Sequence, residues 1–354
     1  MATESQLQNW PELLSALLRW EDLSAEDTSW AMDQVMSGSA SPAQVAAFLV
    51  ALRAKGESVA EIRGLADTMR RFALPITVEG PTLDIVGTGG DGAHTVNIST
   101  MAAIVSAGSG ARVVKHGNRA ASSSSGAADV LEALGISLNL PPDRVEHVAR
   151  EAGITFCFSQ TFHPSMRYAA VPRRELGIPT AFNILGPLTN PARPRFSAVG
   201  AADGRVADLI AGVFAERGSS AAVFRGDDGL DELSVAGTSS VRWVRDGEIS
   251  LHVVDPSSVG IERARIDALR GGDAAYNARV VTQVLAGQLG PVRDAVVLNA
   301  GIALALAAEG TGRFPGHETF EQALHSGVEQ ARAAIDDQSA ARALQRWITA
   351  TGKS

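Results

Sequence analysis

A glycine-rich segment, Gly87-Thr88-Gly89-Gly90-Asp91-Gly92, separates a short apolar run from a longer apolar segment. The run before it, residues 83–86, has the length and composition of a buried strand, and residues 97–107 after it predict a helix. A second pair follows, with a strand at 112–114 and a helix at 127–134. Strands that alternate with helices in this way are typical of a largely parallel sheet with helices on both faces. The sequence therefore predicts an α/β fold around a mainly parallel central sheet.

Later apolar runs extend this predicted sheet. Candidate strands lie at 155–158, 197–200 and 221–224, and helical stretches separate them. Asp246-Gly247 stands between two further strand-like runs, and this dipeptide favours a tight hairpin, so we expect an antiparallel edge there. From about residue 274 the pattern returns to helices.

The chain before about residue 79 carries helix signals and no strand signal. Ser24-x-x-Asp27 and Ser58-x-x-Glu61 have the pattern of a helix N-cap with its acidic partner, and Ser41-Pro42 that of an N-cap followed by proline in the first turn. Together with an apolar stretch at 13–18, these signals predict about four short helices. We therefore expect a small helical domain, residues 1–78, before a larger α/β domain, residues 79–354.

Composition limits the class of protein. The 354 residues carry 39 acidic and 31 basic side chains, a net charge of −8, which argues against a nucleic-acid binder. The single cysteine, Cys157, excludes an internal disulfide and a thiolate zinc site, and a reducing cytoplasm is the expected location. The most apolar run, 295–308, is about 14 residues long and contains Asn299, so we expect it not to span a bilayer.

The glycine segment matches G-x-G-x-x-G, but a dinucleotide site also needs an acidic residue about 20 positions later. The second strand ends instead in the cationic run Lys115-His116-Gly117-Asn118-Arg119, and the nearest acid, Asp129, falls inside the next helix. The dinucleotide interpretation therefore fails. A strand-to-helix glycine loop still offers free backbone N–H groups to an anion, and two successive loops of this kind predict a phosphate site. The alternative is that both loops are only tight turns.

Two other groups of side chains suggest chemistry. Asp227, Asp228, Asp231 and Glu232 crowd one glycine turn, which is unfavourable without a cation, and Mg²⁺ prefers such oxygen ligands. The alternative is a solvated surface turn. Arg173-Arg174 offers a guanidinium suited to a carboxylate, or is simply an exposed basic pair. No nucleophile triad or metalloprotease motif is present in the sequence, and His116 is the one candidate for proton transfer.

At these residues the sequence resembles the anthranilate phosphoribosyltransferase family. The resemblance runs along nearly the whole chain, and its most specific segment is Phe182-Asn183-Ile184-Leu185-Gly186-Pro187-Leu188-Thr189-Asn190-Pro191. It implies an enzyme of the second step of tryptophan biosynthesis from chorismate, in the fold class of a helical domain joined to an α/β domain. The reaction would join phosphoribosyl pyrophosphate (PRPP) to the amino group of anthranilate with Mg²⁺, giving N-(5-phosphoribosyl)anthranilate and pyrophosphate.

The resemblance also implies the roles of individual residues. Metal ligands would be Ser99, Asp231 and Glu232, holding two Mg²⁺ ions per monomer, and anthranilate would meet Gly87, Asn118 and Arg173. Ser124 departs from the lysine that many relatives place in this loop, which lowers the charge expected there. The residues expected to bind PRPP come from the two loops: Gly87, Gly90, Asp91, Thr95, Asn97, Ile98, Ser99, Thr100, Lys115, His116, Gly117, Asn118, Arg119, Ala120, Ala121, Ser122, Ser123 and Ala127.

The implied partners are the two small-molecule substrates and a second copy of the chain. The homodimer would form through the helical domain, with helices from about 163–190 contributing to it, and neither a nucleic acid nor a membrane is expected. Two alternatives remain open on the sequence alone. A pyrimidine nucleoside phosphorylase-like enzyme has a similar Lys-His-Gly-Asn-Arg segment but needs no tandem acid pair, and a non-catalytic nucleic-acid-binding relative conflicts with the negative charge.

Overall fold

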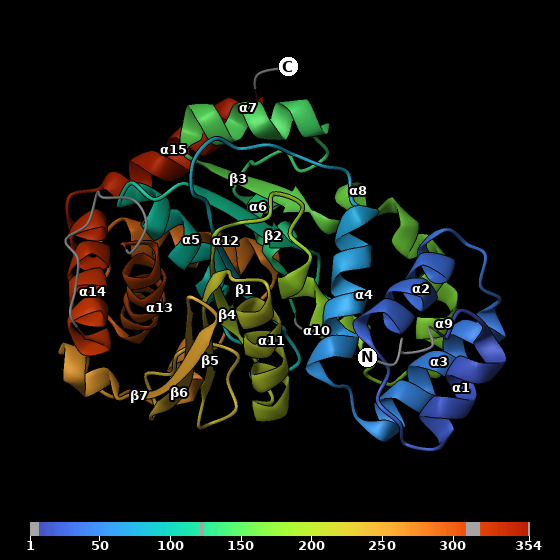
Figure 1. Ribbon diagram of the computed structural model, residues 1–354. Coiled ribbons are helices and arrows are strands. Elements are labelled where there is room, and N and C mark those ends of the chain that lie inside the picture. The colour runs from blue at the N-terminus through green and yellow to red at the C-terminus, as the bar shows by residue number, and fades with distance from the viewer. Residues whose placement is uncertain (1–6, 121–123, 309–318, 353–354) are drawn as a thin grey trace.

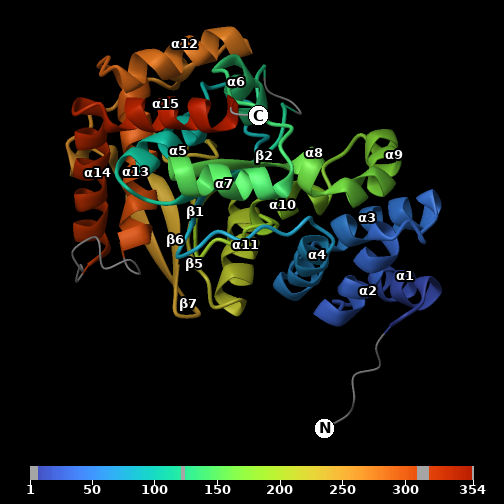
Figure 2. The same cartoon turned by 90° about the horizontal axis from the view of Figure 1, so that it is seen from above.

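The computed structural model describes residues 7–120, 124–308 and 319–352 (Figure 1). A group of helices from the N-terminal part lies at one side of a larger part built on a central sheet (Figures 1 and 2). The predicted fold class, a small helical part with an α/β part, is confirmed. The predicted boundary at residue 78 stays a prediction. Three residues of the predicted PRPP loop, Ala121, Ser122 and Ser123, lie outside the described residues.

Four helices form the N-terminal bundle, as the start signals predict. Three of them begin with a capping box in which a serine side chain and a residue three positions later satisfy each other's backbone N–H groups: Ser24 with Asp27, Ser41 with Gln44, and Ser58 with Glu61. Their bounds are α1 (Trp10–Leu18), α2 (Ala25–Met36), α3 (Pro42–Lys55) and α4 (Val59–Arg71).

The central sheet has seven strands in the order β3-β2-β1-β4-β5-β6-β7. The first five run parallel, and β6 and β7 form the predicted antiparallel edge, joined by Asp246 and Gly247, both with positive φ. The strands are β1 (Leu83–Gly87), β2 (Val113–Gly117), β3 (Ile154–Phe158), β4 (Phe196–Gly200), β5 (Ser220–Gly226), β6 (Ser239–Arg245) and β7 (Glu248–Val254).

Helices cover both faces of the sheet along its parallel strands, whose apolar residues point to both sides, whereas Ile249, Leu251 and Val253 of β7 are exposed. One face packs against helices from the middle and end of the chain, and the other against α11 and the N-terminal bundle (Figure 2). The helices of the α/β part are α5 (Ile98–Gly108), α6 (Ala127–Ala133), α7 (Pro142–Ala152), α11 (Gly204–Glu216), α12 (Ala274–Leu285), α13 (Pro291–Ala308), α14 (Phe320–Asp336) and α15 (Ser339–Gly352).

Helix α13 contains the apolar run noted in the sequence, but it is 18 residues long and begins four residues earlier than that run. Within the described part of the chain it is the one helix that is long and apolar enough to cross a membrane by length and composition. Because 78% of it is buried inside the protein, it is a core helix packed on one face of the sheet.

The segment 159–188 forms several short helical pieces. Pro164 cannot supply a backbone N–H, so the chain breaks into α8 (Ser159–Phe162), a 3-10 turn at Pro164–Met166, and α9 (Arg167–Leu176), which packs against α2 and α3. A further short helix, α10 (Phe182–Leu185), and a 3-10 turn, η2 (Gly186–Leu188), follow.

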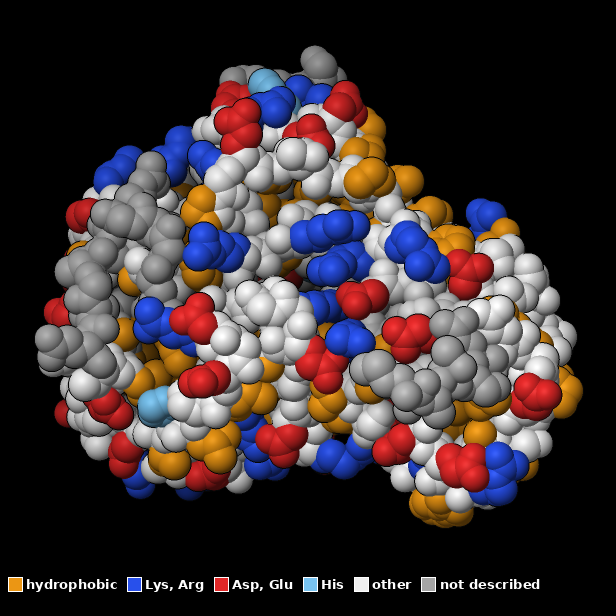
Figure 3. Space-filling view, in the orientation of Figure 1, with side chains coloured by type: hydrophobic (Ala, Val, Ile, Leu, Met, Phe, Trp, Pro, Cys, Tyr) orange, Lys and Arg blue, Asp and Glu red, His pale blue; other side chains and the backbone are white. Residues whose placement is uncertain are grey.

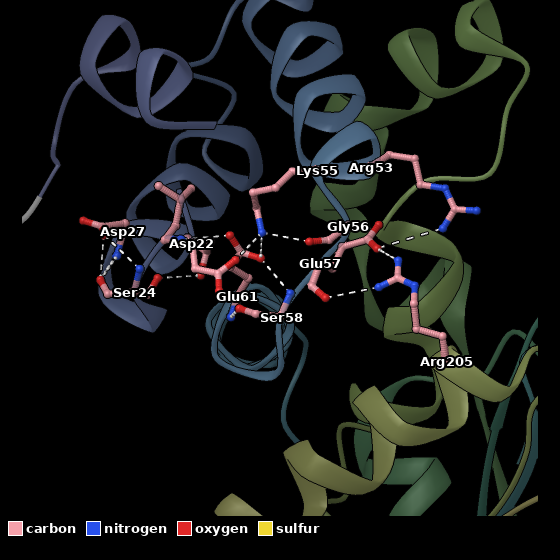
Figure 4. A network of polar contacts seen from close by, with 12 residues as sticks. Asp22, Ser24, Asp27, Arg53, Lys55, Gly56, Glu57, Ser58, Glu61 and Arg205 are labelled. Atoms are coloured by element: carbon pink, nitrogen blue, oxygen red, sulfur yellow. Dashed lines mark hydrogen bonds and ion pairs between the residues drawn. The ribbon is translucent and has the colours of Figure 1, made fainter. Parts of the chain in front are cut away.

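Ion pairs join the bundle to α11 at both ends of that helix. At its first turn, Arg205 donates to the carboxylate and, at 3.2 Å, to the carbonyl of the buried Glu57 (Figure 4). At its last turn, Arg217 donates to Asp67 of α4 at 2.7 Å. Beside Glu57, the buried Lys55 Nζ lies 3.0 Å from Glu61 and 2.6 Å from Asp22 (Figure 4). The contacts of Arg205 and Arg217 hold the bundle against the α/β part, and those of Lys55 lie within the bundle.

Candidate active site

The glycine loop leaves the carboxyl end of β1 and leads to the N-terminus of α5. Gly89, Gly90 and Gly92 have φ of 70°, 86° and 70°, a backbone region that L side chains rarely adopt, and no atom lies within 4 Å of a Cβ built on any of them. Helix α5 begins without a side-chain cap at Asn97. Open space therefore lies beside a glycine loop that leads to a helix start, a setting that suits an anion.

Asp231 lies directly over the ends of two neighbouring strands. A Cβ at Gly87, the last residue of β1, would collide with the Asp231 carboxylate, and one at Gly200, the last residue of β4, would overlap its carbonyl oxygen. Gly89 N donates to Asp231 Oδ2 at 2.7 Å, which joins the glycine loop to the acidic turn. Glycine at both strand ends is therefore required for the close approach of Asp231.

Asp231 and its neighbour Glu232 are buried carboxylates with unusual proton affinity. Burial, and then the nearby charge of Asp91, raises the pKa of Asp231 to about 7. Burial and the charge of Asp231 raise the pKa of Glu232 well above its usual value, although the amide of Ser99 donates to it. The described residues place no three acidic, histidine or cysteine side chains together as a metal cluster, but the adjacent carboxylates of Asp231 and Glu232, with the charge of Asp91 nearby, would be stabilised by a cation.

The other two acids of the predicted cluster face away from this group. Asp227 accepts a hydrogen bond from the Thr238 hydroxyl, and Asp228 accepts one from the amide of Leu230 at 3.2 Å. The carboxylates that lie near one another are therefore those of Asp231, Glu232 and Asp91. Asp227 and Asp228, which the sequence grouped with them, have other partners.

Lys115 is buried at the same place, on β2. Its Nζ donates to the carbonyl of Ile85 and lies 3.3 Å from Ser99 Oγ, in the first turn of α5. Burial lowers the pKa of Lys115, and the negative charges of Asp84, Glu232 and Asp231 act in the opposite direction. One buried ammonium group therefore faces the predicted metal ligands.

His116 points to the other face of β2. Its Nδ1 lies 3.1 Å from the carbonyl of Gly186, so this nitrogen carries the proton and Nε2 keeps a free lone pair. Burial lowers its pKa to about 4, and that of His163, whose ring centroid is 5.1 Å away, to about 3. Both rings are neutral at pH 7. His163 is not among the predicted site residues, since nothing in the sequence around it indicates its position beside His116.

The second loop is closed by α6. Asp129 accepts hydrogen bonds from the amides of Gly126 at 2.9 Å and Ala120 at 3.1 Å, and Arg119 pairs with Asp129 and Glu132. Asn118 Oδ1 accepts from the Arg119 amide. Two acids of α6 therefore hold Arg119, and the assignment of Arg119 to PRPP stays a prediction.

The remaining predicted residues lie around the start of α5. Asn97 donates to the carbonyl of Ser125 at 3.1 Å and accepts from Asn277 at 2.8 Å, so it links the two loops to α12. Thr95 pairs with Arg270 in an isolated antiparallel bridge. Ile98 and Thr100 are buried in the first turn of α5, and Ala127 begins α6. Asn277 was not among the predicted residues because its contact crosses 180 positions of sequence.

Arg173 lies in the last turn of α9, the helix beside the N-terminal bundle (Figure 1). Its guanidinium lies over the ring of Phe182, 5.0 Å from the centroid, and burial lowers its pKa. It forms no ion pair with any residue that the structure describes, so a charged group held against an aromatic ring is available to an acid.

Comparison with known proteins decides the family. Residues 11–73 match the helical bundle domain, and residues 79–341 the a/b domain, of the glycosyl transferase family. Anthranilate phosphoribosyltransferases of a Nocardioides and an Arthrobacter species are 60% and 57% identical to this chain, which aligns over 98% and 97% of its length and covers 100% and 96% of theirs. The chain belongs to the anthranilate phosphoribosyltransferase family.

Solved structures agree with this assignment. The Thermus thermophilus anthranilate phosphoribosyltransferase superimposes with a TM-score of 0.89 at 39% identity, covering 96% of this chain and 99% of that one. The Saccharomyces cerevisiae enzyme, solved in complex with PRPP and Mg, gives 0.84 at 27% identity, covering 97% and 99%. The same yeast enzyme in complex with 4-fluoroanthranilate gives 0.83 at 26% identity, covering 97% and 98%. Family membership favours phosphoribosyl transfer over the phosphorylase and nucleic-acid alternatives.

Proposed function

We propose that this chain transfers the phosphoribosyl group of PRPP to the amino group of anthranilate and releases pyrophosphate, the second step of tryptophan biosynthesis from chorismate. The observation that carries the proposal is the meeting of an open, positive-φ glycine loop with the buried Asp231–Glu232 pair at one end of the sheet. The first suits the phosphates of PRPP, and the second suits the metal that accompanies them. The yeast relative with PRPP and Mg supports the same ligands.

The described residues fit Mg²⁺. Asp231 and Glu232 are adjacent, buried and raised in pKa, so their ionised forms need a compensating cation, and hydroxyl and carboxylate oxygens are its preferred ligands. We propose that Asp231, Glu232 and Ser99 hold the metal, with two ions per monomer. When bound, Mg²⁺ would supply positive charge to the departing pyrophosphate.

The chain's own residues position the substrates. We place the phosphates beside the glycine loop beyond Gly89, whose own N–H donates to Asp231, and near the start of α5, where Lys115 adds a positive charge beside Ser99. The aromatic amine of anthranilate is unprotonated at neutral pH, so attack on the ribose carbon requires no strong base. The depressed pKa of His116 fits this, because the neutral ring is a weak base at pH 7 and its Nε2 is buried. Catalysis is then mainly orientation and stabilisation of the leaving group.

The direct test is the loss of anthranilate fluorescence when PRPP and Mg²⁺ are added to the purified chain. We expect turnover with all three components and none when PRPP or Mg²⁺ is omitted. Replacing PRPP by a pyrimidine nucleoside with phosphate tests the phosphorylase alternative. Turnover of the nucleoside with no fluorescence change in the PRPP assay would overturn the proposal.

Arg173→Ala should separate the two substrates. If the guanidinium pairs with the carboxylate of anthranilate, its loss removes a charge-assisted contact of ~1.5–3 kcal/mol, and kcat/KM for anthranilate should fall roughly 10- to 150-fold. The KM for PRPP should stay near the wild-type value, and Arg173→Lys should restore only part of the loss, since an ammonium cannot reproduce the planar fork. The adjacent Arg174→Ala is the matched control. If Arg173→Ala lowers the melting temperature and raises both KM values alike, Arg173 only supports α9.

We propose that the chain forms a homodimer through its helical bundle and α9. Apolar side chains remain exposed on three neighbouring helices there, among them Leu18 on α1, Val50 on α3 and Val171 on α9. These helices lie together at the outer side of the bundle (Figures 1 and 2). Exposed apolar side chains on neighbouring helices are what an interface through this bundle would cover. No nucleic-acid or membrane partner is proposed, and a cytoplasmic location suits an enzyme with one buried thiol.

Sedimentation analysis tests the dimer. The double variant Val50→Arg, Val171→Arg should shift the chain from dimer to monomer at micromolar concentration, because two buried charges would be left unpaired on each side of the interface. Ile249→Arg, at a similarly exposed apolar position on β7, should leave the dimer intact. A wild-type chain that sediments as a monomer, or a double variant that stays dimeric, would contradict this interface.

A further inference from the structure

The central pair of strands separates before its carboxyl end. β1 pairs with β4 along the whole of Leu83–Gly87, and β2 pairs with β3 along the whole of Val113–Gly117. Between β1 and β2, by contrast, the pairing is confined to Leu83 and Val113, where the amide of Leu83 donates to the carbonyl of Arg112 at 2.9 Å. Beyond this pair the ladder between the two strands does not continue, and each strand leads into one of the two loops.

If the parallel ladder between β1 and β2 continued, two further backbone hydrogen bonds would follow. The amide of His116 would donate to the carbonyl of Ile85, and the amide of Ile85 to the carbonyl of Val114. All four of these groups are buried, so each needs another partner once the strands part.

Side chains supply those partners. Asp84 Oδ1 accepts from the amide of His116 at 3.1 Å, and the same carboxylate takes the amide of Ile85. Lys115 Nζ donates to the carbonyl of Ile85. Asn190 Nδ2 donates to the carbonyl of Val114 at 2.8 Å and to Asp84 Oδ2 at 2.9 Å. We call Asp84, Lys115 and Asn190 the polar bridge, because together they replace the missing rung.

The polar bridge carries a large desolvation cost. Asp84 is fully buried, and Lys115 and Asn190 are 2% and 3% exposed. Burying a carboxylate and an ammonium group costs several kcal/mol per ion before their attraction and hydrogen bonds offset it, whereas an aliphatic pair in the same strands would simply continue the ladder. An arrangement of this cost, placed at the strand ends that carry both phosphate loops, points to a positional role.

We infer that Asp84 and Asn190 are positioning residues that hold β1 and β2 apart and thereby set the distance between the two loops that enclose PRPP. The inference rests on the proposed function for its substrate. Gly87 and Gly117 end the two strands, and the loops begin there, so closing the ladder would bring the loops together and withdraw Lys115 from Ser99. Asp84 itself touches neither loop and faces the opposite side of the sheet from Lys115.

Asp84→Asn is the first test. Its amide nitrogen would face the amide nitrogen of Asn190, so the bridge loses its donor–acceptor match while side-chain size is kept. We expect the KM for PRPP to rise roughly tenfold or more, the KM for anthranilate to change less than about twofold, and hydrogen exchange at the His116 amide to accelerate. Thr155→Val is the matched control: Thr155 is buried on β3 opposite Val114 and also loses one hydrogen bond, yet it lies outside the bridge.

The double variant Asp84→Asn, Asn190→Ala is the second test. Asn190 donates both to Asp84 and to the carbonyl of Val114, so each single change breaks the same bridge, and we expect the KM for PRPP of the double variant to lie within about threefold of that of the more impaired single variant. Asn190→Ala, which leaves Asp84 in place, serves if Asp84→Asn does not fold.

The outcomes separate the inference from the proposed function. Unchanged KM for PRPP and unchanged exchange at His116 in the single variants would overturn the inference, as would a double variant whose losses simply multiply, or a Thr155→Val variant with the same KM change. A wild-type chain without phosphoribosyl transfer would instead overturn the proposed function. The exchange measurement needs no substrate, so it reports on the bridge in either case.

Discussion

The double variant Asp231→Asn, Glu232→Gln is expected to fold and to lose at least ~100-fold in turnover, comparable to the loss of a principal stabiliser of developing charge. The two substitutions keep size and remove both carboxylates from the place where we put the metal. Folding should survive because burial makes these charges costly in the metal-free protein, as the raised pKa values of Asp231 and Glu232 show. The measurement is turnover of anthranilate as a function of Mg²⁺ concentration.

Asp227→Asn is the control for this variant. Asp227 belongs to the same acidic turn but is engaged with Thr238, so its removal should leave the Mg²⁺ requirement unchanged. The pKa of about 7 at Asp231 adds a pH dependence: below that pH a proton competes with the metal, so the Mg²⁺ concentration for half-maximal turnover should fall as the pH rises from 6 to 8. Normal turnover of the double variant at limiting Mg²⁺ would refute the metal assignment.

Local signals explain why much of the fold can be predicted from the sequence. The three serine caps at Ser24, Ser41 and Ser58 act within four residues, and the Asp246-Gly247 turn within two, so tertiary structure need not be known. The same holds for the glycine loop, whose function follows from backbone conformation alone. The predicted strands of the sheet and helices α1, α5 and α6 appear where the sequence places them, with ends shifted by up to three residues.

The parts that could not be predicted depend on contacts between distant segments. Asp84 and Asn190 are 106 positions apart, and nothing near either residue indicates that they share a hydrogen bond. The position of β4 beside β1 makes Gly200 a partner of Asp231, and the break at Pro164 brings His163 to His116. The acidic turn shows the same limit: sequence spacing grouped four acids, while folding turned two of them away.

Gly89→Val is the second variant for which we expect a very large effect, the loss of measurable PRPP binding. Gly89 has a φ of 70°, which a β-branched residue resists at a cost of order 1–3 kcal/mol, and the space around its Cβ position is open, so the valine would occupy room that the phosphates need. Its amide also holds Asp231 Oδ2 at 2.7 Å, so a change of backbone conformation would disturb the glycine loop and the predicted metal ligand together.

Backbone strain alone could lower the affinity of Gly89→Val for PRPP, and Gly153→Val is the control for strain. Gly153 has a φ of 77° and equally open surroundings, but it lies at the opposite end of the sheet, between α7 and β3. Both variants should therefore melt at similarly lowered temperatures, because each carries the same backbone strain. Calorimetric titration with PRPP and Mg²⁺ should then show no heat of binding for Gly89→Val and near wild-type affinity for Gly153→Val. Equal affinity in the two variants would mean that the glycine loop does not contact the phosphates, and the anion site would have to lie elsewhere.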